Sequence, residues 1–170
     1  PGFSRALAGG VNTLEILPGS ANLFGGRGVT LKNVYGRTAQ DMIFPGAPMS
    51  LKMACGENPK RVYGSKGQMP GSRMGNVALM RQTWAKARDY QAKLRTAKAP
   101  IQRDLQMETL VGVLEGKILV QNHCYRADEM ANIISMSKEF GYKVSAFHHA
   151  VEGYKIADLL RDNGICAAMW

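Results

Sequence analysis

Residues 117–170 contain one hydrophobic pattern twice: a short apolar run that ends in histidine, then a segment with helical spacing. In the first copy, residues 118–121 predict a strand, and residues 127–140 predict a helix because apolar side chains recur at i, i+3 and i+4. In the second copy, residues 142–147 predict a strand, and a helix follows that ends at residues 163–164. Strands that alternate with helices of this length predict parallel βαβ units and an α/β fold.

All three histidines of the chain lie where these predicted strands end. His123 follows the first strand, and the adjacent His148 and His149 follow the second strand about one repeat later. Ligands and metals gather at the carboxyl ends of parallel strands. The pattern therefore predicts a metal or catalytic site at this edge of the sheet. The alternative is that the histidines are polar residues tolerated at strand–loop junctions.

A glycine-rich segment, residues 18–48, follows a predicted strand at residues 11–17 and is expected to be a long loop. It contains Ser20, Asn22 and a glycine turn around Arg27, which together can present backbone N–H groups to an anion. The segment matches neither a P-loop nor a dinucleotide-binding motif. A plain surface loop and a substrate loop both fit this sequence, and its position after a strand favours the substrate loop.

The next predicted strand, residues 49–55, has Lys52 inside an apolar run. A buried lysine is costly unless it is paired or has a chemical role, so Lys52 is a candidate site residue. Glu57 leaves the same end of the strand and is a second candidate. The alternative is an edge-strand lysine that points to solvent, with Glu57 as a turn residue.

Positive charge is concentrated in one segment of the chain. The net charge is +9, and residues 60–103 hold eleven Lys or Arg against one acid, Asp89. This segment predicts a basic loop at residues 60–72 and two helices at residues 76–98 and 101–114. The basic row on the longer helix is expected to be a solvated face rather than a binding surface. We therefore expect no nucleic-acid partner.

Composition limits the remaining possibilities. The chain has 170 residues, 45% of them hydrophobic, which suffices for one globular domain with a core. No apolar run approaches the roughly 20 residues that span a membrane, so no membrane partner is expected. The three cysteines, Cys55, Cys124 and Cys166, lack metal-binding spacing, and each is expected to be a buried, inert thiol.

Several motifs resemble the amidohydrolase superfamily, in particular its imidazolonepropionase-like branch with some prolidase-type dipeptidases. The most specific are His-x-x-Arg-Ala-Asp from His123 and, one repeat later, His-Ala-x-Glu-x-x-Lys-x-Ala-Asp. The segment around residues 9–34 and the segment SLKMACGENPKRVYG are also similar. The resemblance implies a metal-dependent (β/α)8 barrel of the TIM type. It also implies hydrolysis of C–N bonds in a small amide, cyclic amide or peptide-like substrate.

The resemblance also implies a ligand set for one or two divalent ions, with zinc the expected metal. His123 matches the fifth-strand ligand, and His149 matches the sixth-strand ligand, with His148 as the alternative. Lys52 matches the fourth-strand lysine if it is carboxylated, with Glu57 as the substitute. These residues are the expected catalytic and metal-binding groups. The expected substrate-binding residues are Ser20, Asn22, Arg27, Tyr63, Arg126 and Tyr154.

The chain departs from the family pattern in two ways. It contains no His-x-His, and no counterpart of the family's eighth-strand aspartate is present. Residues 1–170 are therefore expected to form a single incomplete catalytic domain, roughly strands three to seven of the barrel. We expect this chain to be inactive alone within an active full-length hydrolase. Alternatives are a non-catalytic basic binding module and a barrel scaffold without metal.

Overall fold

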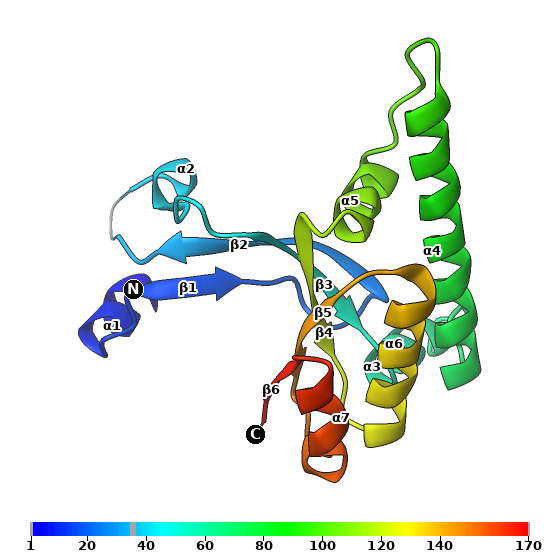
Figure 1. Cartoon of the computed structure of the whole chain (residues 1–170). Helices are drawn as coiled ribbons and strands as arrows, with labels where there is room; N and C mark the ends of the chain where they lie inside the picture. The colour runs from blue at the N-terminus through cyan, green and yellow to red at the C-terminus, as the bar shows by residue number, and fades with distance from the viewer. Residues whose placement is uncertain (1, 35–36, 170) are drawn as a thin grey trace.

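A computed structural model of the chain describes residues 2–34 and 37–169, and it is built around a six-stranded sheet (Figure 1). The strands lie in sequence order from one edge of the sheet to the other. They are β1 (Thr13–Ile16), β2 (Phe24–Lys32), β3 (Met49–Ala54), β4 (Ile118–His123), β5 (Val144–His148) and β6 (Cys166–Ala168).

The helices connect the strands of the sheet, and most of them follow the parallel strands. The α-helices are α1 (Gly2–Ala8), α2 (Ala39–Met42), α3 (Glu57–Gly64), α4 (Arg73–Thr96), α5 (Leu105–Leu114), α6 (Ala127–Phe140) and α7 (Ala157–Asp162). A short 3-10 helix, η1 (Gly153–Ile156), leads into α7. Among the described residues, no helix is both long enough and apolar enough to cross a membrane.

Strand direction divides the sheet into two parts. β1, β2 and β3 pair antiparallel, whereas β3, β4, β5 and β6 pair parallel. The predicted βαβ units are thus confirmed, and the predicted helix at residues 127–140 coincides with α6. The sheet curls into a half-barrel, with α4, α6 and α7 along one side of it (Figure 1). The carboxyl ends of three successive strands, β3 to β5, therefore meet at one edge.

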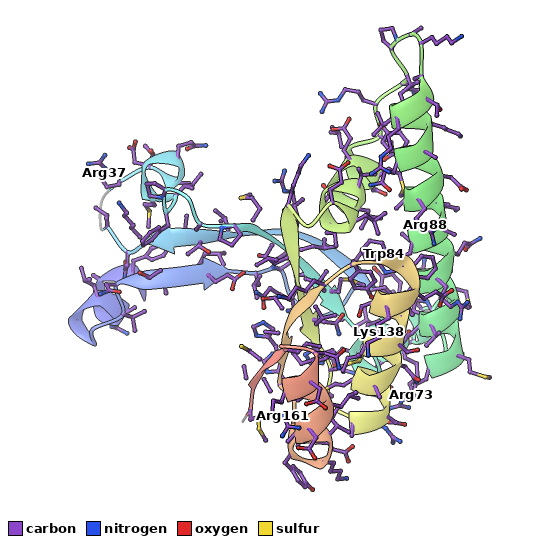
Figure 2. All side chains as sticks on the ribbon, in the orientation of Figure 1. Arg37, Arg73, Trp84, Arg88, Lys138 and Arg161 are labelled. Carbon is purple, nitrogen blue, oxygen red and sulfur yellow. A yellow bond between two sulfur atoms is a disulfide. The ribbon has the colours of Figure 1, made fainter. Side chains whose placement is uncertain are left out.

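The hydrophobic core lies between the sheet and these helices. Its largest buried side chain is Trp84 of α4, which points toward the sheet (Figure 2). The Trp84 ring stacks on Tyr142 at a centroid distance of 4.3 Å and meets Phe24 of β2 edge-on at 5.4 Å. Met53 of β3 and Phe147 of β5 are fully buried in the same cluster. The core therefore holds one face of the parallel strands against the helices.

The predicted loop at residues 18–48 is wrong, because this segment contains strand β2 and helix α2. β2 pairs with both β1 and β3, and its glycines allow that close approach. A Cβ at Gly28 would lie 2.6 Å from Leu17 Cδ2 and 3.0 Å from the Ile16 carbonyl oxygen. The predicted basic loop at residues 60–72 is also wrong in its first part, because helix α3 extends to Gly64.

The expectation of three buried, inert thiols is also wrong. Cys55 and Cys124 form a disulfide with a Cα–Cα distance of 5.3 Å, and the free Cys166 is exposed. The reason is the register in which β3 pairs with β4. Ala54 of β3 lies opposite His123 of β4, so the residues that follow them lie side by side. Cysteines 69 positions apart in sequence are thus neighbours in the sheet.

Candidate active site

The candidate site lies on the face of the sheet that points away from the helices. Side chains alternate between the two faces of a strand, and parallel partners point to the same side. Core residue Met53 points toward the helices, so its neighbour Lys52 points to the opposite face. Lys52 pairs with Gln121, and His123 lies two residues further along β4 on the same face. Residues predicted from separate segments therefore share one surface.

His123 is almost completely buried in this surface, with 1% of its area exposed. Neither of its ring nitrogens has a hydrogen-bond partner within the described part of the chain. Its ring centroid lies 4.5 Å from that of Tyr125 and 4.9 Å from that of His149. Burial, with smaller effects from His149, Lys52 and His148, lowers the pKa of His123 from 6.5 to about 4. The imidazole is therefore neutral at neutral pH, which is the form that binds metals.

The two adjacent histidines at the end of β5, His148 as its last residue and His149 directly after it, have different environments. His149 has a positive φ of 57°, which takes it out of the strand alternation, and its ring lies against His123. Burial and then the charge of Lys52 lower the pKa of His149. His148 lies opposite His123 in the β4–β5 register, and its Nε2 is 2.8 Å from the Gln121 side-chain oxygen. An amide oxygen only accepts, so Nε2 of His148 donates this bond.

Lys52 is buried, with 5% of its area exposed, so the alternative of a solvent-facing lysine on an edge strand is wrong. Its Nζ donates to the Pro18 carbonyl oxygen at 3.0 Å and to Ser20 Oγ at 3.2 Å. Burial lowers the pKa of Lys52. No described carboxylate lies within ion-pair distance of its ammonium. Lys52 therefore holds the β1–β2 connection over the site while its charge stays uncompensated.

Comparison with known proteins identifies the family of this chain. No protein-family model matches it. The chain is 32% identical over 174 residues to "Amidohydrolase tasK" of Hapsidospora irregularis. It also superimposes on a crystal structure of an amidohydrolase from Thermotoga maritima with a TM-score of 0.92 and 37% sequence identity. The chain belongs to the amidohydrolase superfamily.

The two relatives are longer than this chain. The match to the Hapsidospora protein covers 90% of this chain and 18% of that protein. The match to the Thermotoga structure covers all of this chain and 45% of that chain. The high TM-score over the whole chain places the curled sheet and its helices within the architecture of that amidohydrolase.

Amidohydrolases typically use divalent metals, which require several donor side chains close together. In residues 2–34 and 37–169, no three His, Cys, Asp or Glu side chains form a group that could hold a metal. What the structure brings together is two imidazoles, His123 and His149, and one lysine, Lys52. The unpartnered, neutral nitrogens of His123 fit a metal ligand, because a buried polar atom without a partner is costly.

The other predicted metal ligand, Glu57, is not brought to the histidines. Its carboxylate lies 3.2 Å from Lys60 Nζ and 3.0 Å from Arg73 Nη2. The hydrogen bond from Lys60 is the largest of the effects that lower the pKa of Glu57. In this amidohydrolase chain Glu57 therefore joins helix α3 to the start of α4.

The predicted substrate-binding residues separate into three groups. Ser20 accepts a hydrogen bond from Lys52, and Asn22 accepts one from the hydroxyl of Tyr63. Ser20, Asn22 and Tyr63 therefore lie around the β1–β2 connection. Arg27 is exposed and lies opposite the core residue Leu51, which puts it on the helix side of the sheet, away from the histidines.

Arg126 and Tyr154 are exposed residues that follow β4 and β5, respectively. Arg126 forms an ion pair with Asp128 at 2.9 Å, and Tyr154 is 66% exposed in η1. Both come after the carboxyl ends of their strands, where loops of the site are expected. The Lys155 ammonium lies 5.9 Å from the Tyr154 ring centroid, so Arg126 and Tyr154 both have charged partners outside the histidine cluster.

Three residues of the site were not predicted from the sequence. Gln121 lies two positions before His123, so strand alternation already indicated a shared face. Tyr125 packs edge-on against His123, and nothing in the local pattern signals this contact. Burial and then the charge of Lys52 lower the pKa of His148, and the negative charge of Glu15 in β1 acts in the opposite direction. The influence of Glu15 depends on the curl of the sheet and has no sequence signal.

Proposed function

We propose that this chain carries part of the active site of a metal-dependent hydrolase that cleaves C–N bonds. In this proposal the sheet is roughly strands three to seven of a (β/α)8 barrel of the imidazolonepropionase-like and prolidase-like branch. The substrate is a small amide, cyclic amide or dipeptide. The observation that carries the proposal is His123, a neutral and buried imidazole at a strand end with neither ring nitrogen hydrogen-bonded within the described residues.

His123 and His149 would hold the divalent ion, for which zinc is the expected metal. When bound, the ion polarises the scissile carbonyl and lowers the pKa of a coordinated water. His149 is preferred over His148 because its ring lies against His123, whereas Nε2 of His148 is occupied by Gln121. Imidazoles with lowered pKa values stay unprotonated at neutral pH, so no proton competes with the metal.

Lys52 would contribute as a carboxylated lysine. An unmodified ammonium beside two imidazoles repels a cation, whereas carboxylation converts it into an oxygen ligand with negative charge. Burial already lowers the pKa of Lys52, which favours the neutral amine that carboxylation requires. Its hydrogen bond to Ser20 would then connect the metal site to the β1–β2 connection, where Asn22 and Tyr63 lie. This connection would form one wall of the substrate pocket.

The ligand assignment is tested by measuring zinc binding to the chain by isothermal titration calorimetry. We expect His123→Ala and His149→Ala each to weaken binding by about tenfold or more, the scale typical for loss of one metal contact. His148→Ala is the matched control, because it removes an adjacent imidazole that is not a preferred ligand. Equal losses for His148→Ala and His149→Ala would contradict the assignment.

The activity is tested with the complete gene product. Dipeptides and cyclic amides are supplied as substrates, and release of the amine is followed with zinc present and after chelation. We expect hydrolysis that chelation abolishes and that His123→Ala reduces by several orders of magnitude. Mass spectrometry of the intact protein at neutral pH tests the carboxylation of Lys52. Hydrolysis that persists in the chelated protein would refute the metal-dependent mechanism.

A further inference from the structure

The disulfide between Cys55 and Cys124 lies directly behind the candidate metal site. Cys55 follows β3, three positions after Lys52, and Cys124 follows His123. Both cysteines belong to the hydrophobic core on the helix side of the sheet, whereas Lys52 and His123 point to the other face. The bond therefore joins the backbone of the two strands that supply the candidate ligands, without adding a sulfur to the ligand set.

The backbone around the disulfide forms the last cross-strand contacts of this edge. The Cys55 N–H donates to the His123 carbonyl oxygen at 2.9 Å, and the Cys124 N–H donates to the His148 carbonyl oxygen at 3.2 Å. These two bonds align β3 with β4 and β4 with β5 at the point where the histidines lie. Beyond them the chain leaves the sheet, so the disulfide reinforces the positions at which the ladder otherwise frays.

One of the two disulfide cysteines lines a cavity. A cavity of about 390 Å³ lies between α4 and α6, and Cys55 lines it together with Gly56, Met80 and Ile133. Arg73, labelled in Figure 2, marks the end of α4 that lines this cavity. Cys124 is fully buried and does not line it. Cys55, with 5% of its area exposed, is therefore the more accessible cysteine of the pair, whereas Cys124 is fully buried.

The surroundings of Cys124 suit a leaving thiolate. The side-chain amide of Asn122, itself fully buried, donates from Nδ2 to Cys124 Sγ at 3.6 Å. A donor at this position stabilises negative charge on the sulfur. Attack on Cys55 with departure of Cys124 is thus favoured by both access and leaving-group stabilisation.

We propose that the Cys55–Cys124 disulfide is a redox-sensitive lock on the candidate metal site, opened by a dithiol reductant. One thiolate of the dithiol attacks Cys55 Sγ, the S–S bond breaks, and Cys124 leaves as a thiolate that takes up a proton. The second thiol of the dithiol then displaces Cys55 from the mixed disulfide. The protein gains two electrons and two protons, and the dithiol becomes a disulfide.

Opening the lock removes the covalent link between the ends of β3 and β4, and leaves the ladder and the ion pairs of Arg73 with Glu57 and Glu129 to hold them together. The separation between Lys52 and His123 is then less constrained, and a metal that needs both residues binds more weakly. This inference rests on the proposed function, because the regulated property is metal binding at Lys52, His123 and His149. The chain offers a matched control in Cys166, an exposed thiol outside the pair.

The first experiment follows the backbone by hydrogen–deuterium exchange with mass spectrometry, with no metal present. The native chain is compared before and after dithiothreitol treatment, and alkylation mapping confirms the reduction. We expect the amides of Cys55 and Cys124 to exchange about tenfold faster after reduction, the scale of losing one hydrogen-bond contribution. Cys166→Ala should respond as the wild type does. The Cys55→Ala/Cys124→Ala variant should exchange fast in both conditions.

The second experiment titrates cobalt(II) into the oxidised and the reduced wild-type chain. We expect reduction to raise the Kd by about tenfold, without the near-ultraviolet charge-transfer band that marks a thiolate ligand. Wild-type protein in its two redox states suffices if the double variant does not fold.

Three results overturn the inference: a disulfide that dithiothreitol reduces only in denaturant, exchange rates that reduction leaves unchanged, or equal cobalt affinities in both states. Absence of cobalt binding in either state refutes the proposed function as well. The exchange data then still show whether the disulfide constrains the strand ends, so the two failures are distinguishable.

Discussion

Acid destabilises this protein through His123, and the size of the effect follows from the burial of that residue. Its pKa falls from 6.5 to about 4 on folding, chiefly because burial penalises the charged imidazole. Between these values the unfolded chain binds a proton that the folded chain does not. Stability therefore falls as pH decreases below about 6.5 and levels off below about 4.

The size of this loss of stability follows from the linkage between proton binding and folding. Each tenfold difference in proton affinity corresponds to about 1.4 kcal/mol, so the full loss through His123 is about 3 kcal/mol. About 2 kcal/mol of this is already lost at about pH 5. That is a large share of the free energy of unfolding of a small domain, which is typically about 5–15 kcal/mol.

Urea unfolding at several pH values, with and without the substitution His123→Gln, measures this contribution. The neutral amide cannot titrate, so the variant should lose about 2 kcal/mol less than the wild type between about pH 7 and about pH 5. The comparison uses the change with pH, so any constant cost of the substitution cancels. Identical pH profiles for wild type and variant would refute the burial argument for His123.

Other substitutions test the core, the sheet and the buried lysine. Trp84→Ala should cost about 3–5 kcal/mol in urea unfolding, because it empties the largest buried site of the core. Gly28→Ala should cost about 1–3 kcal/mol, since its Cβ meets Leu17 and backbone, whereas Gly19→Ala, with open space around it, should be nearly neutral. Because burial lowers the pKa of Lys52 from 10.5, the unfolded chain holds this proton more tightly, so wild-type stability should rise as pH increases towards about 10.5, and Lys52→Met should abolish that rise. A core that tolerates Trp84→Ala, equal effects of the two glycine substitutions, or an unchanged alkaline profile would contradict the respective structural reason.

The regions best predicted from sequence are those in which one local pattern suffices. Helix α6 was predicted with its observed bounds, because its apolar spacing and the glycine that follows it are both local signals. Strands β3 and β4 were predicted within one or two residues, because buried parallel strands are continuous apolar runs. For Lys52 the apolar neighbours left two alternatives, a buried lysine and an edge-strand lysine that points to solvent, and the structure shows the buried one.

The regions that were missed depend on partners distant in sequence. β2 is rich in glycine and weak as an isolated strand, yet it is stabilised by pairing with β1 and β3 on its two sides. The role of Glu57 could not be predicted, since its ion pair with Arg73 joins two helices whose packing no local pattern specifies.

The sequence by itself determined the repeating strand–histidine–helix units and placed all three histidines at strand carboxyl ends, because these features depend only on side-chain periodicity. The tertiary structure decided which of these groups meet. It brought the His149 ring to His123, occupied His148 with Gln121, and joined Cys55 to Cys124. Each of these contacts is set by strand register and by the backbone turn at His149, and both emerge only when separate strands pair and curl into one sheet.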